Sequence, residues 1–260
     1  MPIEVKATVR HLDQEDFGRI AYDVMGHVFE IHNEFGRFFD EKIYKRELSR
    51  ICPGTLLEVP IEVTFESFRK LYFLDALVDG GAAFEFKTVE ALTDRHRSQL
   101  LHYLLIADLS HGKLVNMRTE QVQHEFVNTT LRTCDRTRFE VTDRGWQELG
   151  DKPIMEWCTA FLRDIGTCLD LSLYEESLTH LLGGENYALQ EVEVISGGCA
   201  LGQQKFRLVA PDVAFKITAL TDDPRLFENH ARRLLEHTSL KVIQWINVTK
   251  DEVSFQTISK

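Results

Sequence analysis

Two carboxylates and one ammonium are brought together by the segment LYFLDALVDGGAAFEFK at 71–87. If this segment forms a hairpin whose turn is centred on Gly80, residues whose numbers sum to 160 lie opposite each other, so Asp75 faces Glu85. Lys87 projects to the same face, two residues beyond Glu85. Oxygen-rich sites of this kind suit Mg²⁺ or Mn²⁺, which bridge to phosphate oxygens. The pattern therefore predicts a divalent metal site that acts on a phosphate.

The alternative for this segment is a solvated hairpin face, since Glu-x-Lys is a common strand sequence. The hairpin argues against it, because both of its faces are largely apolar, as in a covered central sheet, through Phe73, Leu77, Phe84 and Phe86. A buried carboxylate requires a partner or a metal ion. We therefore favour the site over the solvated face.

The elements that must position these residues follow from hydrophobic periodicity and from breaking residues. A helix is expected from its N-cap Asp13 to Gly36, and another from Phe39 to about Arg50, before the break at Pro53-Gly54. The pattern then predicts strands at 56–66, 71–78 and 82–88, a helix at 94–107, and strands at 113–117 and 122–127. This order indicates an α/β unit.

Further residues of this first run follow a known pattern. In chain order they are Asn33-Glu34-Phe35-Gly36, Glu41-x-x-Tyr44, Leu74-Asp75, Glu85-x-Lys87, Gln99-x-x-x-Tyr103 and the closing strand Gly112-Lys113-Leu114-Val115-Asn116. The sequence resembles the PD-(D/E)xK phosphodiesterase superfamily over about residues 18–127, and more closely its GxxExxY branch. One departure from the branch is clear, since the first Gly of GxxExxY is Phe38 here.

The resemblance implies a restriction-endonuclease-like α/β/α fold with a mixed central sheet flanked by helices. It implies that Asp75 and Glu85 hold Mg²⁺ or Mn²⁺, assisted by the carbonyl of Phe86 and, directly or through water, by Glu41. Lys87 would orient the attacking water and offset charge on the phosphate. The expected activity is that of a metal-dependent nuclease, with DNA as the expected substrate.

Some of the residues in this pattern have structural alternatives. By resemblance Gln99 hydrogen-bonds within the site, but Gln99 and Tyr103 could equally serve helix packing and capping. Glu41 could be a solvent-facing helix residue. Tyr44 is interpreted as a packing residue. Arg95 to Arg97 begin a helix beside the site and could meet phosphate or form a solvated first turn.

The order of elements starts again after a connector of mixed charge, with a short helix expected near Trp146. The second run is predicted as helices at 154–165 and 170–182, strands at 189–195, 204–209 and 212–218, a helix at 224–237 and strands at 241–247 and 252–257. Three blocks align in order, 33–48 with 163–178, 84–94 with 213–222 and 114–122 with 245–253. We interpret the chain as a nuclease-like domain at 1–130, a connector at 131–152 and a degenerate copy at 153–260.

The second copy lacks the acids of the first. In this alignment Lys216 matches Lys87, but Ala214 stands at the position of Glu85 and Leu171 at that of Glu41. The second unit is therefore expected to be an inactive pseudo-domain that pairs with the first within one chain, so a monomer is expected.

Composition limits the function further. The 260 residues include 41 acidic and 30 Lys or Arg residues, a net charge of −11, whereas a protein that binds nucleic acid usually shows a basic face. Any such face must be local, which favours a DNA end, branch or single strand over long duplex. The acidic balance also suits a protein partner, so the alternative function is a non-catalytic interaction or scaffold protein that retains a nuclease-like fold.

Other classes of protein are disfavoured by motifs that the sequence does not contain. The five cysteines form no CxxC and the ten histidines no HExxH, which argues against zinc and iron–sulfur sites. No apolar run approaches the ~18 residues of a membrane span. The first residues have no apolar core after a basic cap, so no signal peptide is indicated and a cytoplasmic location is expected.

Overall fold

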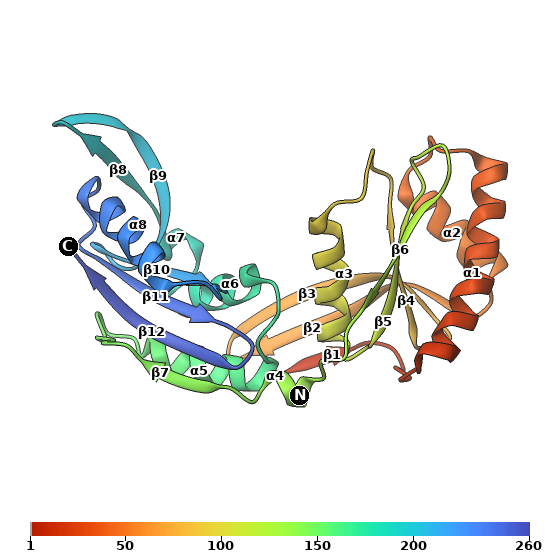
Figure 1. Cartoon of the computed structure of the whole chain (residues 1–260), viewed down its shortest axis with the longest axis horizontal. Coiled ribbons are helices and arrows are strands. Elements are labelled where there is room, and N and C mark those ends of the chain that lie inside the picture. Colours follow the sequence, from red (N-terminus) through yellow and green to blue (C-terminus); the bar gives the residue numbers. More distant parts are fainter. Residues whose placement is uncertain (1) are drawn as a thin grey trace. The chain divides into compact units, whose positions relative to one another are not determined.

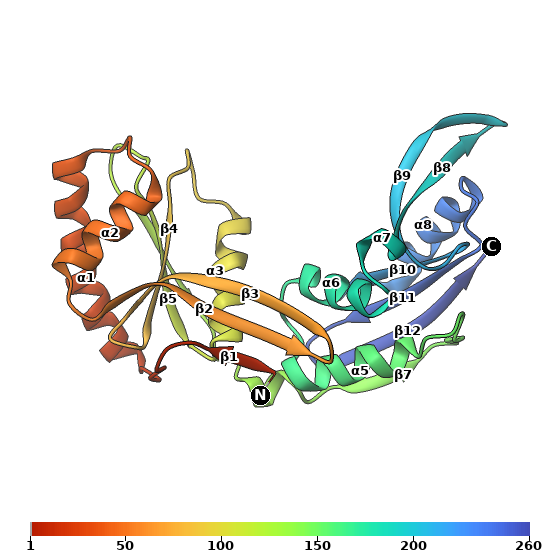
Figure 2. The ribbon, with the colours of Figure 1, turned by 180° about the vertical axis from the view of Figure 1, so that it is seen from behind.

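The computed structural model describes residues 2–260, which form two α/β units (Figures 1 and 2). The first unit comprises the chain up to Thr64 and Arg69–Thr133. The second comprises Cys134–Lys260 and the short turn Phe65–Phe68. Each unit is built on one six-stranded sheet.

The first unit places helices on both faces of its sheet (Figure 1). Its elements are β1 (Ile3–Val5), α1 (Gln14–Phe35), α2 (Glu41–Ile51), β2 (Thr55–Phe65), β3 (Phe68–Val78), β4 (Ala82–Lys87), α3 (Asp94–Ile106), β5 (His111–Asn116) and β6 (Gln123–Asn128). The strand order is β1-β2-β3-β4-β5-β6, with β4 and β5 parallel. Helices α1 and α2 cover one face through a core that includes Phe17, Val28, Leu48, Phe84 and Phe86.

The second unit is also a sheet with helices packed against it (Figure 2). A short helix α4 (Thr133–Arg136) precedes β7 (Glu140–Asp143), α5 (Ile154–Ile165), α6 (Leu171–Leu181), α7 (Glu185–Ala188), β8 (Leu189–Ser196), β9 (Cys199–Ala210), β10 (Val213–Thr218), α8 (Pro224–Glu236), β11 (Val242–Val248) and β12 (Glu252–Ser259). The strand order is β7-β12-β11-β10-β9-β8, and β10 is parallel to β11.

The two sheets share the connectivity of five strands and differ in the sixth, because β1 pairs with β2 whereas β7 pairs with β12. In each, five consecutive strands lie side by side in chain order, β2 to β6 and β8 to β12, and a helix joins the two parallel strands at the centre. The expected fold class, two α/β units with mixed sheets flanked by helices, is confirmed.

One tyrosine fixes the loop between two helices in each unit, between α1 and α2 in the first and between α5 and α6 in the second. The hydroxyl of Tyr44 donates to the carbonyl of Gly36 at 2.8 Å and accepts from the N–H of Phe39 at 3.1 Å. Tyr174 makes the same two bonds, to the carbonyl of Gly166 and from the N–H of Leu169, both at 2.9 Å. Tyr44 therefore has the packing role expected of it, at the start of α2.

The connector differs from its prediction. Residues 140–143 form β7, which pairs in parallel with β12, so this part belongs to the second sheet. The helix expected near Trp146 is wrong, because residues 146–149 have no regular structure. The strand could not be recognised from its sequence, EVTD, because four residues at a sheet edge are too short to establish alternation.

Candidate active site

The β3–β4 hairpin has the register expected from its sequence, with Ala76 opposite Phe84 and Val78 opposite Ala82. The ladder ends at Ala76. One residue further, the Asp75 carboxylate accepts the backbone N–H of Phe86 at 2.8 Å through Oδ2. The carboxylate of Asp75 thus takes the place of a backbone carbonyl as the acceptor of this N–H. The hydrogen bond holds the carboxylate against β4.

Glu85 is the most deeply buried acid of this region. It is 1% exposed, and Lys87 donates to its Oε1 at 2.6 Å. Within residues 2–260 the other oxygen, Oε2, has no hydrogen-bond partner although it is buried. A buried carboxylate oxygen without a partner is costly, so this atom is available to a ligand that carries positive charge.

Lys45 is a buried cation that the sequence patterns did not single out. Its side chain is 7% exposed, and its Nζ lies 2.7 Å from Oδ1 of Asp75 and 3.1 Å from Oε1 of Glu41. It also donates to Glu58 on β2. The available signal was the spacing of Glu41 and Lys45, four residues apart on one helix face.

The electrostatics of the cluster follow from burial and from crowding of like charge. Burial and the neighbouring Asp75 raise the pKa of Glu85 to about 8, and the same two causes raise the pKa of Glu41. Burial opposes the charge on Lys87, but the interaction with Glu85 outweighs it and raises its pKa. The pKa of Lys45 is raised despite burial by its hydrogen bonds to Asp75 and Glu58.

The donor set fits a divalent cation in charge and chemistry. The four carboxylates of Glu41, Glu58, Asp75 and Glu85 face two ammoniums, so the fully ionised cluster lacks two positive charges. Its ligands are hard oxygens, which Mg²⁺ and Mn²⁺ prefer. In residues 2–260, however, no three His, Cys, Asp or Glu side chains converge as a ready-made metal cage. A bound ion would therefore share these carboxylates with the lysines.

Gln99 lies on α3 and donates to the hydroxyl of Tyr103 at 3.2 Å. The pKa of Tyr103 is raised by burial and also by the charges of Glu85 and Asp75. The hydrogen bond joins two side chains one turn apart on α3.

The pairing of strands in the second unit shows which of its residues occupy the positions of the first unit's site. This correspondence differs from that of the sequence alignment. Asn116 on β5 bonds the N–H and carbonyl of Val89, at 3.1 and 2.8 Å. Asn247 on β11 bonds Leu220 in the same way, at 2.7 and 2.9 Å. Lys87 is the register partner of Asn116, and Thr218 is that of Asn247.

Two residues before Thr218, Lys216 therefore occupies the position of Glu85. The sequence alignment, which includes a one-residue deletion, pairs Lys216 with Lys87 instead. In the structure β4 and β10 each have six residues, so the deletion lies beyond the strand.

The second unit reverses the charge at two positions of the first unit's site, those of Lys45 and Glu85. Glu175 on α6 stands where α2 has Lys45. Its carboxylate lies 3.4 Å from Nζ of Lys216 and 3.2 Å from Nη1 of Arg207. Thus an acid between two bases replaces a base between three acids, and this arrangement has no place for a cation.

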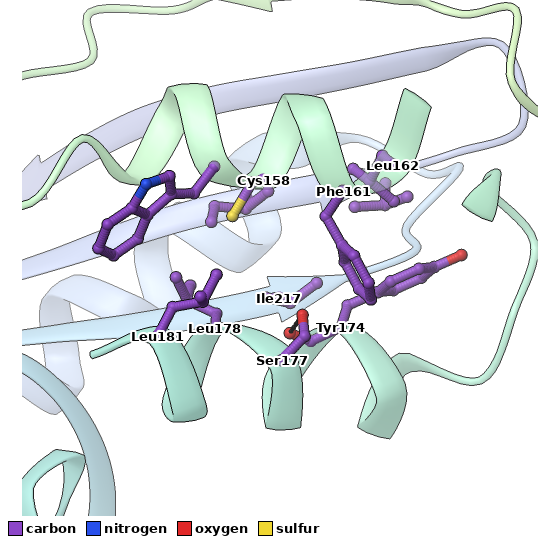
Figure 3. A pocket seen from close by; sticks show the side chains of 11 residues that line it. Cys158, Phe161, Leu162, Tyr174, Ser177, Leu178, Leu181 and Ile217 are labelled. Atoms are coloured by element: carbon purple, nitrogen blue, oxygen red, sulfur yellow. Dashed lines mark hydrogen bonds between the residues drawn. The ribbon is translucent and has the colours of Figure 1, made fainter. Parts of the chain in front are cut away.

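A small gap lies between α5, α6 and the sheet of the second unit (Figure 3). Its volume is about 10 Å³, and its lining is mostly apolar, including Phe161, Leu178 and Ile217. Burial raises the pKa of the lining thiol, Cys158, to about 12, so the thiol stays protonated. The gap has room for at most one water molecule and is a packing feature.

No helix within residues 2–260 has both the length and the hydropathy to cross a membrane.

Comparisons with known proteins give one family match, over the part of the chain that holds the candidate site. No curated protein matches the chain. The crystal structure of SSO0001 is 18% identical, with a TM-score of 0.30, over 50% of this chain and 71% of that one. The family model of the PD-(D/E)XK nuclease superfamily matches residues 18–129, which contain Glu41, Asp75, Glu85 and Lys87. Residues 18–129 are therefore similar to the PD-(D/E)XK nuclease superfamily, and the match ends before the first strand of the second sheet.

Proposed function

We propose that the first unit is a metal-dependent phosphodiesterase that hydrolyses nucleic acid, with DNA as its substrate. One observation carries the proposal: two buried carboxylates, Asp75 and Glu85, lie on adjacent strands with Lys87 bonded to one of them and a buried oxygen of Glu85 unpaired. The match to the nuclease superfamily over residues 18–129 supports the reaction class.

Each residue of the site has a definable task. Asp75 and Glu85, with the carbonyl of Phe86 and with Glu41 nearby, would hold Mg²⁺ or Mn²⁺. When bound, the ion would polarise the phosphate and lower the pKa of water. The ammonium of Lys87 orients the attacking water and stabilises negative charge that develops on the phosphate. Its bond to Glu85 fixes its direction.

The remaining residues organise this centre. Lys45 ties Asp75 to Glu41 and Glu58, so three elements, α2, β2 and β3, meet at one ammonium. On α3, Gln99 hydrogen-bonds Tyr103, whose pKa is raised in part by the charges of Glu85 and Asp75. We infer that the second unit is a degenerate copy that takes no part in hydrolysis and stands in for a second subunit.

A second candidate function is binding without hydrolysis. The observation that favours it is the ammonium of Lys45, which already neutralises Asp75 at 2.7 Å. A scaffold would need no more than this to keep the fold stable. It would not require Lys87 on the same face, or an unpaired oxygen on Glu85.

The test combines cleavage with metal binding. Linear, nicked, branched and single-stranded DNA and a single-stranded RNA are incubated with the protein and Mg²⁺ or Mn²⁺, and products are followed on denaturing gels. Titration calorimetry with Mn²⁺ should show binding that disappears in Asp75→Ala. It should persist in Asp212→Ala, whose carboxylate is instead paired with Lys241 in the second unit. Equal loss in both variants, or no cleavage of any substrate, would contradict the proposal.

A further inference from the structure

Phe38 stands where the GxxExxY pattern has its first glycine, and the side chain of Phe38 is 75% exposed. It lies in the loop between α1 and α2. Burial does not explain a phenylalanine there. A single exposed apolar side chain is common on protein surfaces, so what surrounds the ring decides its significance.

Two guanidinium groups lie over this ring. The guanidinium carbon of Arg37 is 5.2 Å from the ring centroid of Phe38, and that of Arg118 is 5.9 Å from it. Both distances are within the range of cation–π attraction. The two arginines come from separate elements, the end of α1 and the end of β5, so folding rather than local sequence assembles the cluster.

The arginines are not held by strong ion pairs. Arg37 lies 4.0 Å from Glu120 and Arg118 lies 3.7 Å from Glu90, and both acids are almost fully exposed, at 87% and 93% of the side chain. Exposed pairs of this length contribute little. The two guanidiniums can therefore exchange these partners for a stronger anion such as a phosphate.

The cluster lies at the same end of the sheet as the proposed active site. Phe38 precedes Glu41 by three residues, a chain length of at most about 11 Å. Arg118 follows Asn116 by two residues, and Asn116 is the register partner of Lys87. A bond between His32 and the carbonyl of Thr119, 3.1 Å long, ties the loop that carries Arg118 to α1.

We propose that Phe38, Arg37 and Arg118 form a platform for one unstacked nucleobase and its flanking phosphates. The inference rests on the proposed function and names its substrate class: a single strand or a frayed end. An aromatic ring stacks on any base without sequence preference, and arginines beside it take the backbone. A duplex keeps its bases stacked inside and offers nothing to the ring. The platform also supplies the local positive charge that a chain of net charge −11 needs to hold nucleic acid.

The test measures binding without metal, so that cleavage does not interfere. Fluorescence anisotropy in EDTA compares three labelled probes: a 12-residue oligothymidylate, an abasic strand of the same length, and a duplex. Phe38→Ala should weaken binding of the oligothymidylate about 5- to 100-fold and leave the abasic and duplex probes unchanged. Phe38→Trp should restore binding. The double variant Arg37→Ala with Arg118→Ala should weaken both single-stranded probes and flatten their salt dependence.

Tyr22→Ala is the matched control, because Tyr22 is 81% exposed on α1 but about 20 Å along that helix from its end. Equal weakening of the oligothymidylate and abasic probes by Phe38→Ala would overturn the platform, as would no effect at all. Absence of measurable binding of the oligothymidylate by the wild-type protein would also overturn it. The outcome is independent of hydrolysis. If binding depends on Phe38 but no cleavage occurs in Mn²⁺, the platform is supported and the proposed activity is contradicted. If cleavage occurs and Phe38→Ala does not affect it, the activity is supported and the platform is contradicted.

Discussion

The two units share a connectivity and differ in the sign of the charges at one place. In the first, Lys45 on the second helix meets acids, and Glu85 lies on the central strand. In the second, Glu175 on the equivalent helix meets bases, and Lys216 occupies the strand position of Glu85. In each unit a charged side chain on this helix pairs with side chains of opposite charge on the sheet. The fold is therefore compatible with either sign at this place.

The comparison also separates structural residues from functional ones. Features that both units keep include the tyrosine that closes the helix–helix loop and the asparagine that closes the loop after the central strand. Glu85 and Lys87 are not kept, because Lys216 and Thr218 occupy their strand positions in the second unit.

The largest expected effect on stability comes from Lys45. Lys45→Met leaves Asp75, Glu41 and Glu58 without their shared ammonium, and removing one partner of a buried ion pair costs about 3–5 kcal/mol. We expect a loss near the low end of this range, since Glu58 and Glu41 retain contact with solvent. Thermal unfolding in EDTA measures the loss, and saturating Mn²⁺ should recover part of it.

Lys42→Met is the control for this experiment, because Lys42 lies on the same helix but is 65% exposed. Its melting temperature should be unchanged. A melting temperature of Lys45→Met equal to that of the wild type in EDTA would show that the cluster does not depend on this ammonium.

A smaller effect is expected from the two tyrosines, and it tests what the units share. Tyr44→Phe and Tyr174→Phe each remove a hydroxyl that bonds a carbonyl and an N–H, which costs about 1–3 kcal/mol when the partners stay buried. The loss should be greater for Tyr174, because both of its hydrogen bonds are buried whereas those of Tyr44 reach partners that are partly exposed.

Denaturation can separate the two losses, because all three tryptophans, Trp146, Trp157 and Trp245, lie in the second unit. Tryptophan fluorescence should shift in Tyr174→Phe, whereas circular dichroism should record the shift in Tyr44→Phe. A stabilising effect or no effect in either variant would mean that the shared loop is not held by its tyrosine.

The hairpin and the first helix were predictable from the sequence because the signals there are local. Asp13 caps α1 by accepting the N–H of Asp16 at 2.8 Å, and Gly36 ends the helix with a φ of +71°. The register of the β3–β4 hairpin follows from a turn centred on Gly80. These features need only the residues within a few positions of each other.

Features that depend on distant contacts were not predictable. The role of Lys45 is set by strands that lie up to 30 residues further along the chain. The register of β10 could not be chosen from sequence either. Aligning Lys216 with Lys87 and aligning it with Glu85 differ by two residues, so both place it on the same face of the strand. Only its pairing with β11 decides between them.

The central claim is that the first unit hydrolyses nucleic acid with Lys87 and that the second unit does not take part. The most direct test is single-turnover cleavage of single-stranded DNA in saturating Mn²⁺ by Lys87→Ala and Lys216→Ala. The account predicts that Lys87→Ala folds and binds Mn²⁺ but cleaves about 10²–10³-fold more slowly, the scale for one preorganised electrostatic group. Lys216→Ala should cleave at the wild-type rate. Wild-type cleavage by Lys87→Ala, or a comparable loss in Lys216→Ala, would contradict it.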